Sequence, residues 1–547
     1  MVQRRHAEKT EDFAQAQSKH PHLARYIEEI TASMGEPDWH LELDRSMRDM
    51  KAPNIIYPVG DPIFIHIHKE QDTGTTRYEV IQPELSKEEE KLMERLVDKM
   101  IEHAHKYEVP NKVEDAGAII KNIFDEVVKI SDHQASNFER VIESKIHLTQ
   151  LEYNNIWYYI FRNRVGYGKL EPLFYDPYLE DIHCTGVSNI KTIHKVFEMV
   201  HTNIEFRNDV ELNKYILDAS ERVERPVSDA NSVVDAIMPD GSRVNFIYGR
   251  ELSLEGSSFT IRKFSEVPVS IIQIVNWGTL SAELAAYLWL CIENGMNIFV
   301  CGETASGKTT TLNAAATFIK PEDKVYSVEN TPEVTMPHET WQHLVTRESG
   351  KDTDVTIFDL LIAALRSRPN YIIVGEIRGE EGNVAFQAMQ TGHPVMSTFH
   401  AGSPHSMIQR LTGHPINVPI ASIDNLNVVL IQQAVSHKGK RVRRVLSVTE
   451  IERYYDVENK VITREVFNWD AVNDEHRFRG LFNSYILEKK IASQLGYEDT
   501  RDIYKELERR TKILTKMSEE GIDNYFDVWD TIAKFEKKGE EALPFVV

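Results

Sequence analysis

A glycine-rich segment near the middle of the chain has the residue types and spacing that bind phosphate. It reads Gly302-Glu-Thr-Ala-Ser-Gly-Lys-Thr309. It follows the apolar run Asn297–Cys301 and precedes a helix-forming run that begins at Thr310. Glycines let the backbone fold tightly, so that its N–H groups and the helix N-terminus face an anion. This order of strand, glycine-rich turn and helix predicts that the protein binds and hydrolyses a nucleoside triphosphate.

Two side chains of this segment are expected to contact the phosphates and a metal ion. Lys308 is placed to reach the β- and γ-phosphates, and the Thr309 hydroxyl is placed to hold Mg²⁺. A glycine-rich turn with an accidental lysine is the alternative, but the strand before it and the helix after it argue against that interpretation. The predicted nucleotide-binding residues are Gly302, Glu303, Thr304, Ala305, Ser306, Gly307, Lys308, Thr309 and Thr310.

Two strand-forming runs further along the chain end in carboxylates. The first contains Glu329 and Glu333, which could polarise the attacking water or bind Mg²⁺ through water. The second, Tyr371–Glu376, ends in Glu376, which is placed to face the γ-phosphate and to contact Mg²⁺ through water. The respective alternatives are an acidic helix cap and a surface glutamate after a buried strand.

A third strand-forming run is flanked by two histidines, His393 and His400, and by glycines. One of the two could hydrogen-bond the γ-phosphate or transmit its presence. A lone histidine here would more often be a satisfied core group, whereas the pair favours a functional role.

Arginines are candidates for stabilising the charge of the transition state. We call the glycine-rich segment 302–309 the phosphate loop. Three arginines precede it in the chain: Arg225, Arg243 and Arg262. An arginine inserted across a subunit boundary could stabilise the transition state in this way. For each of them an ordinary ion pair is the alternative. Three more arginines lie near the strand that ends in Glu376: Arg366, Arg368 and Arg378.

The chain is long enough for several domains, because its 547 residues exceed what one hydrophobic core usually spans. We expect an α-rich N-terminal domain over 1–164, with a small β-hairpin and with about 40 mobile or partner-ordered residues at its start. An α+β regulatory domain that closes over nucleotide is expected over 165–264, and a hinge over 265–280. The remaining residues, 281–547, predict a RecA-like α/β ATPase domain with a mostly parallel sheet and a C-terminal helical extension.

Local patterns place elements within the first of these domains. Two apolar segments between 61 and 81 predict the hairpin, and Ser86–Glu89 predicts a capping box. Further helices are expected over 113–133, 135–148 and 149–164. His66 and His68 share one strand face; a metal pair is conceivable, but a structural face is favoured because no third ligand is evident.

The composition limits which classes of partner and which cell compartment are expected. Lys and Arg total 63 against 85 Asp and Glu, and the formal charge of −22 argues against general attraction to nucleic acid or anionic lipid. The cysteines Cys184, Cys291 and Cys301 form no close pair, so neither a disulfide framework nor a thiolate zinc site is expected. The N-terminus lacks the apolar core of a signal peptide, and Leu284–Val300 is too short and polar to span a bilayer. We expect a cytoplasmic protein that reaches a membrane through partners.

Four motifs together resemble those of the secretion ATPase superfamily of type II and type IV systems. In that family, segments like 302–309, 328–333, 366–378 and 391–401 are the Walker A motif, the Asp box, the Walker B motif and the His box. The upstream segments 166–173, 181–183, 239–245 and 261–263 resemble its N-terminal regulatory domain. The segment 446–480 resembles the archaeal branch, and most closely the archaellum motor ATPases.

The resemblance implies a homohexamer that uses ATP and Mg²⁺ at the cytoplasmic face of the membrane. It also implies a polytopic membrane platform protein and an accessory regulatory ATP-binding protein as partners. The chain departs from the family pattern at Asn330, where an Asp is usual, so that Glu329 or Glu333 must carry the role of the Asp box. The zinc-binding cysteines of many bacterial members are also missing.

Three functions of different classes follow from these observations. The first is an ATPase motor for assembly, or assembly and rotation, of an archaellum or type IV pilus-like filament, with a type II secretion or adhesive pilus ATPase as the alternative machine. The second is a nucleic-acid motor, which the acidic charge disfavours. The third is a non-hydrolysing ATP-binding ring subunit, which Lys308, Thr309 and Glu376 disfavour.

Overall fold

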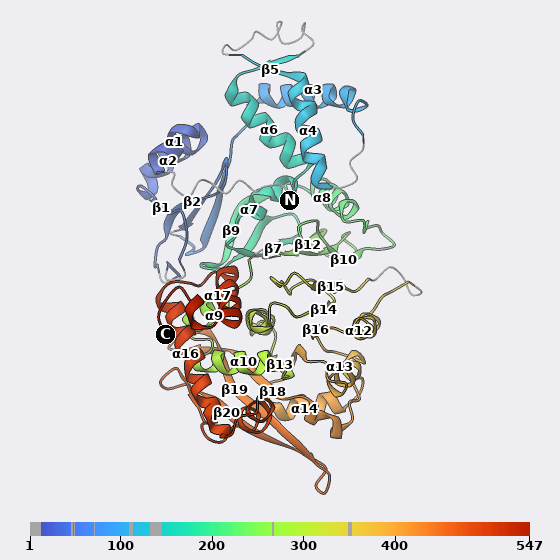
Figure 1. The fold of residues 1–547 in the computed structure, drawn as a ribbon. Helices are drawn as coiled ribbons and strands as arrows, with labels where there is room; N and C mark the ends of the chain where they lie inside the picture. The colour runs from blue at the N-terminus through green and yellow to red at the C-terminus, as the bar shows by residue number, and fades with distance from the viewer. Residues whose placement is uncertain are drawn as a thin grey trace. The chain divides into compact units, whose positions relative to one another are not determined.

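A computed structural model describes residues 12–44, 47–48, 50–70, 72–108, 113–131, 145–264, 267–347 and 353–547. The chain divides into two compact units, Met1–Ser265 and Glu266–Val547 (Figure 1). Each unit has its own sheet and its own buried core. Among the described residues, no helix combines the length and the apolar character needed to cross a bilayer.

The described part of the second unit is built on a nine-stranded sheet with the order β15-β14-β16-β17-β13-β18-β19-β20-β21. The first six strands in that order are parallel. The other three continue the sheet as antiparallel neighbours. The bounds are β13 (Ile298–Gly302), β14 (Val325–Glu329), β15 (Trp341–Val345), β16 (Tyr371–Glu376), β17 (Val395–Phe399), β18 (Val428–His437), β19 (Lys440–Tyr455), β20 (Lys460–Asp470) and β21 (Glu475–Phe478).

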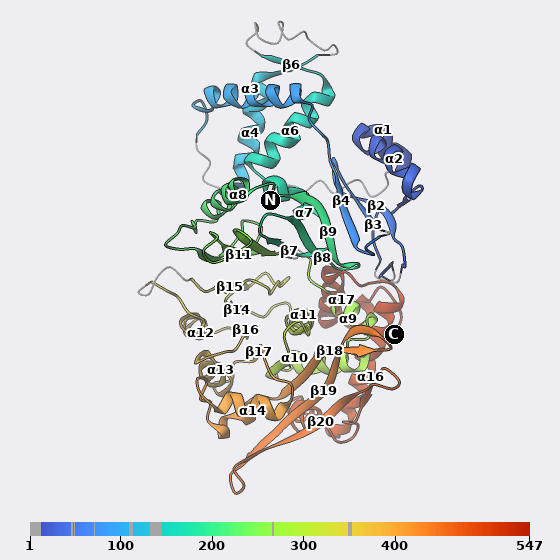
Figure 2. The ribbon, with the colours of Figure 1, turned by 180° about the vertical axis from the view of Figure 1, so that it is seen from behind.

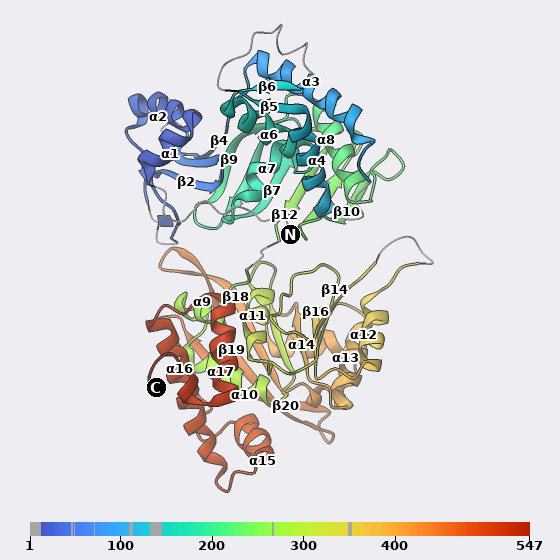
Figure 3. The same ribbon diagram turned by 45° about the horizontal axis from the view of Figure 1, so that its top comes forward.

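Helices cover both faces of this sheet, because alternate residues of its buried strands point to opposite sides. Ile298 and Val300 of β13 enter one core, and Phe299 and Cys301 enter the other. Figure 3 shows α16 and α17 on one side and α12 and α13 on the other. The first core takes α9 (Ile271–Asn276), α10 (Ala282–Glu293), α11 (Lys308–Ala315), α16 (Ile503–Glu519) and α17 (Tyr525–Lys538), and the second takes α12 (Ile357–Arg366), α13 (Glu381–Gln390) and α14 (Pro404–Thr412). This mostly parallel, doubly covered sheet confirms the predicted α/β RecA-like fold class.

The ends of this unit are packed helices. The segment 265–280, which the sequence analysis assigned to a hinge, contains α9, and Ile271, Ile272 and Ile274 are buried in the first core. A capping box at Ser270 starts that helix, so the second half of the expected hinge contains a packed helix. The apolar positions of α16 are also buried in this core, so the C-terminal helical extension packs against the sheet.

The described part of the first unit contains a ten-stranded sheet with the order β1-β2-β3-β4-β9-β8-β7-β12-β11-β10. The parallel pairing of β4 with β9 makes this sheet continuous across residues 164/165, where the sequence analysis drew a boundary. Helices α7 (Glu171–Tyr175) and α8 (Asp209–Arg222) pack on it. The strands are β1 (Asp38–Trp39), β2 (Asn54–Gly60), β3 (Ile63–Lys69), β4 (Thr76–Ile81), β7 (Leu179–Thr185), β8 (Asn189–His194), β9 (Glu198–Glu205), β10 (Val233–Ile237), β11 (Arg243–Ile247) and β12 (Ser258–Arg262).

A separate group of helices belongs to the same unit (Figure 2). It contains α3 (Lys87–Ala104), which begins at the predicted capping box of Ser86, α4 (Val113–Val127) and α6 (Gln150–Arg164). The expected helix over 113–133 is too long, because the chain turns into β5 (Val128–Ile130), which pairs with β6 (Ile146–Leu148). The expected helix over 135–148 is wrong at β6, and its residues 135–144 lie outside the described residues. Helices α1 (Phe13–Lys19) and α2 (Pro21–Met34) pack on β2 to β4.

His66 lies in the predicted hairpin of β3 and β4 and has a structural role. Its Nδ1 is 2.9 Å from the Tyr26 hydroxyl, and its Nε2 is 2.8 Å from Asn54 Oδ1. Both ring nitrogens are therefore engaged by protein groups. The ring stacks on His68 with centroids 4.8 Å apart. These contacts support a structural role for His66.

Asp176 is expected to be a major contributor to the stability of the first unit. Its buried carboxylate accepts hydrogen bonds from the hydroxyls of Tyr57 and Tyr78, both at 2.7 Å, and from the Tyr178 N–H at 2.7 Å. Asp176→Ala would leave two buried hydroxyls without their acceptor, at a cost of about 3–5 kcal/mol. A fall of several degrees in the unfolding temperature of this unit, with little change for the exposed Asp218→Ala, would be the expected calorimetric result.

Acid is expected to destabilise the first unit through buried histidines. Burial lowers the pKa of His66 to about 3 and those of His22 and His194 to about 4. Below about pH 6.5 the unfolded chain binds protons that the folded chain does not, so stability is complete above that pH and falls as the pH drops toward 4. Each histidine contributes a slope of about 1.4 kcal/mol per pH unit. Denaturation at pH 7, 6 and 5 should show that the free energy of unfolding falls less steeply with pH in His66→Gln than in the wild type. Identical pH slopes for the two proteins would contradict this account.

Candidate active site

Parallel strands bring the phosphate loop and the predicted side chains to one edge of the nine-stranded sheet of the second unit. Strands β13, β14, β16 and β17 run in the same direction, so their carboxyl ends meet. The phosphate loop follows β13, Glu329 ends β14, Glu376 ends β16 and His400 follows β17. Open α/β sheets bind their ligands outside the carboxyl ends of their strands. The arrangement therefore forms a candidate nucleotide site.

The backbone of the loop depends on its two glycines. A Cβ on Gly302 would lie 2.1 Å from the carbonyl oxygen of Gln432 in β18, so a side chain there would collide with the neighbouring strand. Gly307 precedes α11 with a φ of 89°, in the left-handed region that favours glycine. The Gln432 amide donates a hydrogen bond to the Ser306 carbonyl at 2.9 Å. These contacts hold the loop against β18 at the N-terminus of α11.

The Lys308 ammonium is held inside the loop. Its Nζ donates to the Glu303 carbonyl at 2.9 Å and lies 3.5 Å from His400 Nδ1. Burial lowers the pKa of this ammonium below its ordinary value, while the carboxylates of Glu376 and Glu333 act in the opposite direction. A dehydrated cation whose strongest bond is to a carbonyl can exchange that bond for one to an anionic oxygen.

Glu376 lies between an arginine and a histidine. Its Oε2 accepts a hydrogen bond from Arg378 at 2.6 Å, and this contact raises the pKa of the guanidinium. Its Oε1 is 2.9 Å from His400 Nε2 but is buried without an aligned donor among the described residues, so it retains acceptor capacity. Burial and the Lys308 ammonium lower the pKa of His400. The Glu376 carboxylate acts in the opposite direction on this pKa, and the net lowering favours the neutral imidazole.

The Glu329 carboxylate is held by backbone N–H groups, and the main chain at Glu333 is held by a side chain of α11. Glu329 is buried, and its Oε1 accepts from the N–H groups of Glu333 and Val334, both at 3.0 Å. Its Oε2 is 2.7 Å from His343 Nε2. The Glu333 carbonyl accepts from the Asn313 amide at 2.9 Å, which ties this segment to the helix after the phosphate loop.

Among the predicted histidines, His400 lies at this edge and His393 does not. His393 precedes β17, whereas His400 follows it. The five-residue strand between them spans roughly 16 Å. His393 Nδ1 is 3.1 Å from the Thr391 hydroxyl, so its observed contact is with its own turn.

The arginines Arg225, Arg243 and Arg262 belong to the first unit, and their proposed role stays a prediction. Arg243 lies 3.8 Å from Asp235 Oδ1, in an exposed ion pair. Arg225 follows α8, and Arg262 ends β12. Arg378 is the arginine that the structure places directly on a predicted catalytic carboxylate.

Several residues at the site were not named by the sequence analysis. Gln432 of β18 and Arg443 of β19 contact the phosphate loop, and the Arg443 Nε donates to the Ala305 carbonyl at 3.2 Å. No local pattern marks either residue, because both contacts depend on strand pairing across more than a hundred residues. Asn313 could have been found, since it lies on the helix that Lys308 begins.

The oxygen donors at this edge fit Mg²⁺. That ion is usually held by one or two protein oxygens together with substrate phosphates and water. The half-buried Thr309 lies in the first turn of α11, and Glu376 Oε1 retains acceptor capacity. These two residues would hold the ion, which would neutralise charge on the phosphates.

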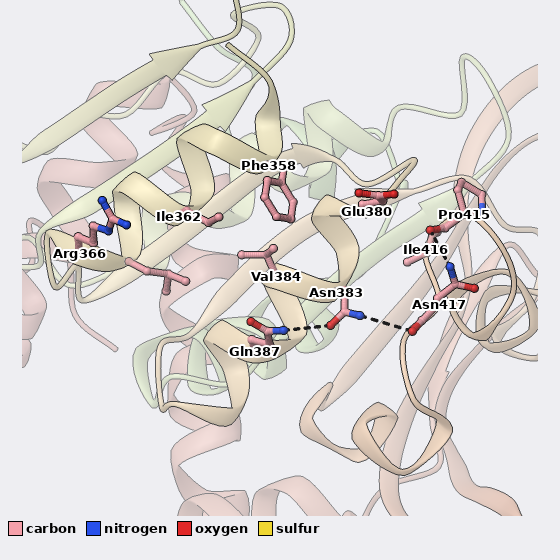
Figure 4. A pocket seen from close by; sticks show the side chains of 11 residues that line it. Phe358, Ile362, Arg366, Glu380, Asn383, Val384, Gln387, Pro415, Ile416 and Asn417 are labelled. Atoms are coloured by element: carbon pink, nitrogen blue, oxygen red, sulfur yellow. Dashed lines mark hydrogen bonds between the residues drawn. The ribbon is translucent and has the colours of Figure 1, made fainter. Parts of the chain in front are cut away.

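The described residues of this unit form a cavity at the phosphate loop and a groove elsewhere. A cavity of about 270 Å³ at the phosphate loop is lined by Gly302, Glu303, Thr304, His400, Ala401 and Gly402. A larger groove of about 630 Å³ lies between α12 and α13 (Figure 4). Asn383 links Gln387 to the Asn417 carbonyl in its wall. The larger groove includes none of the predicted nucleotide-binding residues.

The loop, the strand order and the carboxylates define the class of a P-loop nucleotide-binding protein with a RecA-like domain. Residues 164–524 match the family described as type II/IV secretion system protein. The chain belongs to this family.

Relatives of known sequence or structure resemble the chain over different lengths. An uncharacterised protein of Methanocaldococcus jannaschii is 52% identical over 98% of both chains. A probable conjugal transfer protein, TrbB of Sinorhizobium fredii, is 30% identical over 38% of this chain and 65% of its own. The X-ray structure of the ATPase DotB of Legionella pneumophila is 17% identical, covers 75% of this chain and 96% of its own, and superposes with a TM-score of 0.38.

Proposed function

We propose that the protein hydrolyses ATP with Mg²⁺ and converts the hydrolysis into mechanical work for a type IV pilus-like or secretion machine. One observation carries this proposal. Lys308, His400 and Glu376 form a continuous chain of contacts directly beside the phosphate loop. Membership of the secretion family supports the same activity.

The chain's own residues suggest how the reaction proceeds. Lys308 would exchange the Glu303 carbonyl for phosphate oxygens and would neutralise charge as it develops. Glu329 would take a proton from the attacking water, with Glu333 as the alternative base, and Glu376 would orient groups at the γ-phosphate. Neutral His400, 2.9 Å from Glu376 and 3.5 Å from Lys308, would respond when the lysine moves.

The machine that this ATPase would serve is the finer part of the proposal. We favour a homohexamer at the cytoplasmic face of the membrane that powers assembly, or assembly and rotation, of an archaellum or related filament. It would act through a polytopic platform protein and an accessory ATP-binding protein, with Arg225, Arg243 or Arg262 supplied to a neighbouring site. A type II secretion or adhesive pilus system is the alternative machine.

Phosphate release by the purified full-length chain tests the activity. Turnover is expected with Mg²⁺ and ATP, and it should stop with excess EDTA and recover on Mg²⁺ addition. Addition of DNA or RNA should leave the rate unchanged, since the net charge is −22. No turnover, even with lipids and the platform protein present, would overturn the proposal. Deletion of the gene followed by electron microscopy would identify which filament is lost.

A further inference from the structure

Within the described part of the chain, the contacts that Glu329 makes leave only its Oε2 with room for an additional partner. An ionised carboxylate has about four acceptor positions. Oε1 uses two of them for the N–H groups of Glu333 and Val334. Oε2 uses one for the contact of 2.7 Å with His343 Nε2. The remaining lone pair on Oε2 is therefore the place where a proton from water could be accepted.

His343 is itself held in a defined orientation. It lies on β15, the strand at the edge of the sheet, and pairs with Ser327 of β14. Its ring stacks on Trp341, with centroids 4.9 Å apart and planes inclined by 19°. The Trp341 indole donates to the Ser327 hydroxyl at 2.9 Å. The orientation of the imidazole is thus fixed by β14, the same strand that ends in Glu329.

Glu329 also lies against β16, the strand of the Walker B motif that ends in Glu376. A Cβ on Gly375 would be 3.0 Å from Glu329 Cγ, which is closer than side chains normally pack. The absence of a side chain at Gly375 lets Glu329 lie directly beside the residue that precedes Glu376. An imidazole that fixes Glu329 would therefore fix it at the carboxyl edge where the phosphate loop lies.

We propose that His343 is a positioning residue that orients Glu329 as the general base for the attacking water. The inference deepens the proposed ATP hydrolysis and rests on it. His343 donates its Nε2–H to Oε2 and fixes the direction of the second lone pair of that oxygen. In this chain Asn330 follows Glu329, so the adjacent position supplies no second carboxylate for the same task.

A double-mutant cycle on the full-length protein tests this role. His343→Phe keeps the ring that stacks on Trp341 but removes the donor. We expect kcat to fall about 10-fold to 100-fold, the loss typical when a residue that orients a functional side chain is removed. KM should change by less than about 3-fold, because no nucleotide contact is lost. Introduced into Glu329→Gln, the same change should cause no further loss, because His343 acts through the carboxylate. The separate variant His343→Gln, which keeps an N–H donor, should retain most of the wild-type activity.

The outcomes separate this inference from the proposed function. Equal kcat for wild type and His343→Phe, or additive losses in the double variant, would overturn the inference while ATP hydrolysis stands. Absence of turnover in the wild type would overturn the proposed function and the inference together. If His343→Phe does not fold, His343→Asn takes its place in the test. The shorter amide of Asn does not reach the position of Nε2, so this variant should lose the same activity.

Discussion

Lys308→Met is expected to abolish phosphate release, with a fall of about 10³-fold or more in kcat/KM. The buried ammonium is the cation that the structure places inside the phosphate loop, 2.9 Å from the Glu303 carbonyl. Methionine keeps the length of the side chain but cannot neutralise charge that develops on the phosphates. Nucleotide binding should weaken as well, because the same ammonium contacts bound phosphates before and during the reaction.

Folding controls make this result interpretable. Burial disfavours the charged form of Lys308 and lowers its pKa, so an apolar replacement should leave the unfolding temperature unchanged or slightly higher. The exposed Lys537→Met is the matched control and should retain wild-type turnover. Phosphate release by Lys308→Met at more than a tenth of the wild-type rate would contradict the assignment of this loop.

The phosphate loop and the parallel sheet could be predicted from the sequence because their signals are local. Gly302 and Gly307 are required by backbone geometry within a few residues of the motif. The apolar runs before Glu329 and Glu376 are short, continuous and bounded by polar residues, as buried parallel strands are. Glu329 and Glu376 are the last residues of these strands, so their place at one edge follows from the topology.

The remaining contacts depend on pairings that the sequence does not mark. His343 reaches Glu329 because β15 lies beside β14, and Gln432 reaches the loop because β18 lies beside β13. The sheet of the first unit also could not be predicted from local patterns, because the pairing of β4 with β9 joins segments more than a hundred residues apart. Proximity in sequence pairs His393 with His400, but the two lie at opposite ends of one strand.

Glu376→Gln is expected to separate nucleotide binding from hydrolysis. The substitution keeps the size of the side chain and an acceptor oxygen but removes the negative charge that pairs with Arg378 at 2.6 Å. We expect kcat to fall about 10²-fold to 10³-fold, because the group that orients the reacting oxygens and contacts the metal through water loses its charge. Affinity for ATP should stay within a few-fold of the wild type, since the backbone amides of the loop and Lys308 are unchanged.

Two measurements decide this prediction. Single-turnover kinetics with excess enzyme should show bound but uncleaved ATP in Glu376→Gln, whereas the wild type releases phosphate. Glu380→Gln changes the same chemical group four residues further on, in an exposed position at the groove between α12 and α13, and should turn over normally. Equal losses in both variants would indicate a general effect of removing charge near α13. Normal cleavage by Glu376→Gln would show that Glu329 or Glu333, the carboxylates assigned to the attacking water, suffices without the Walker B carboxylate.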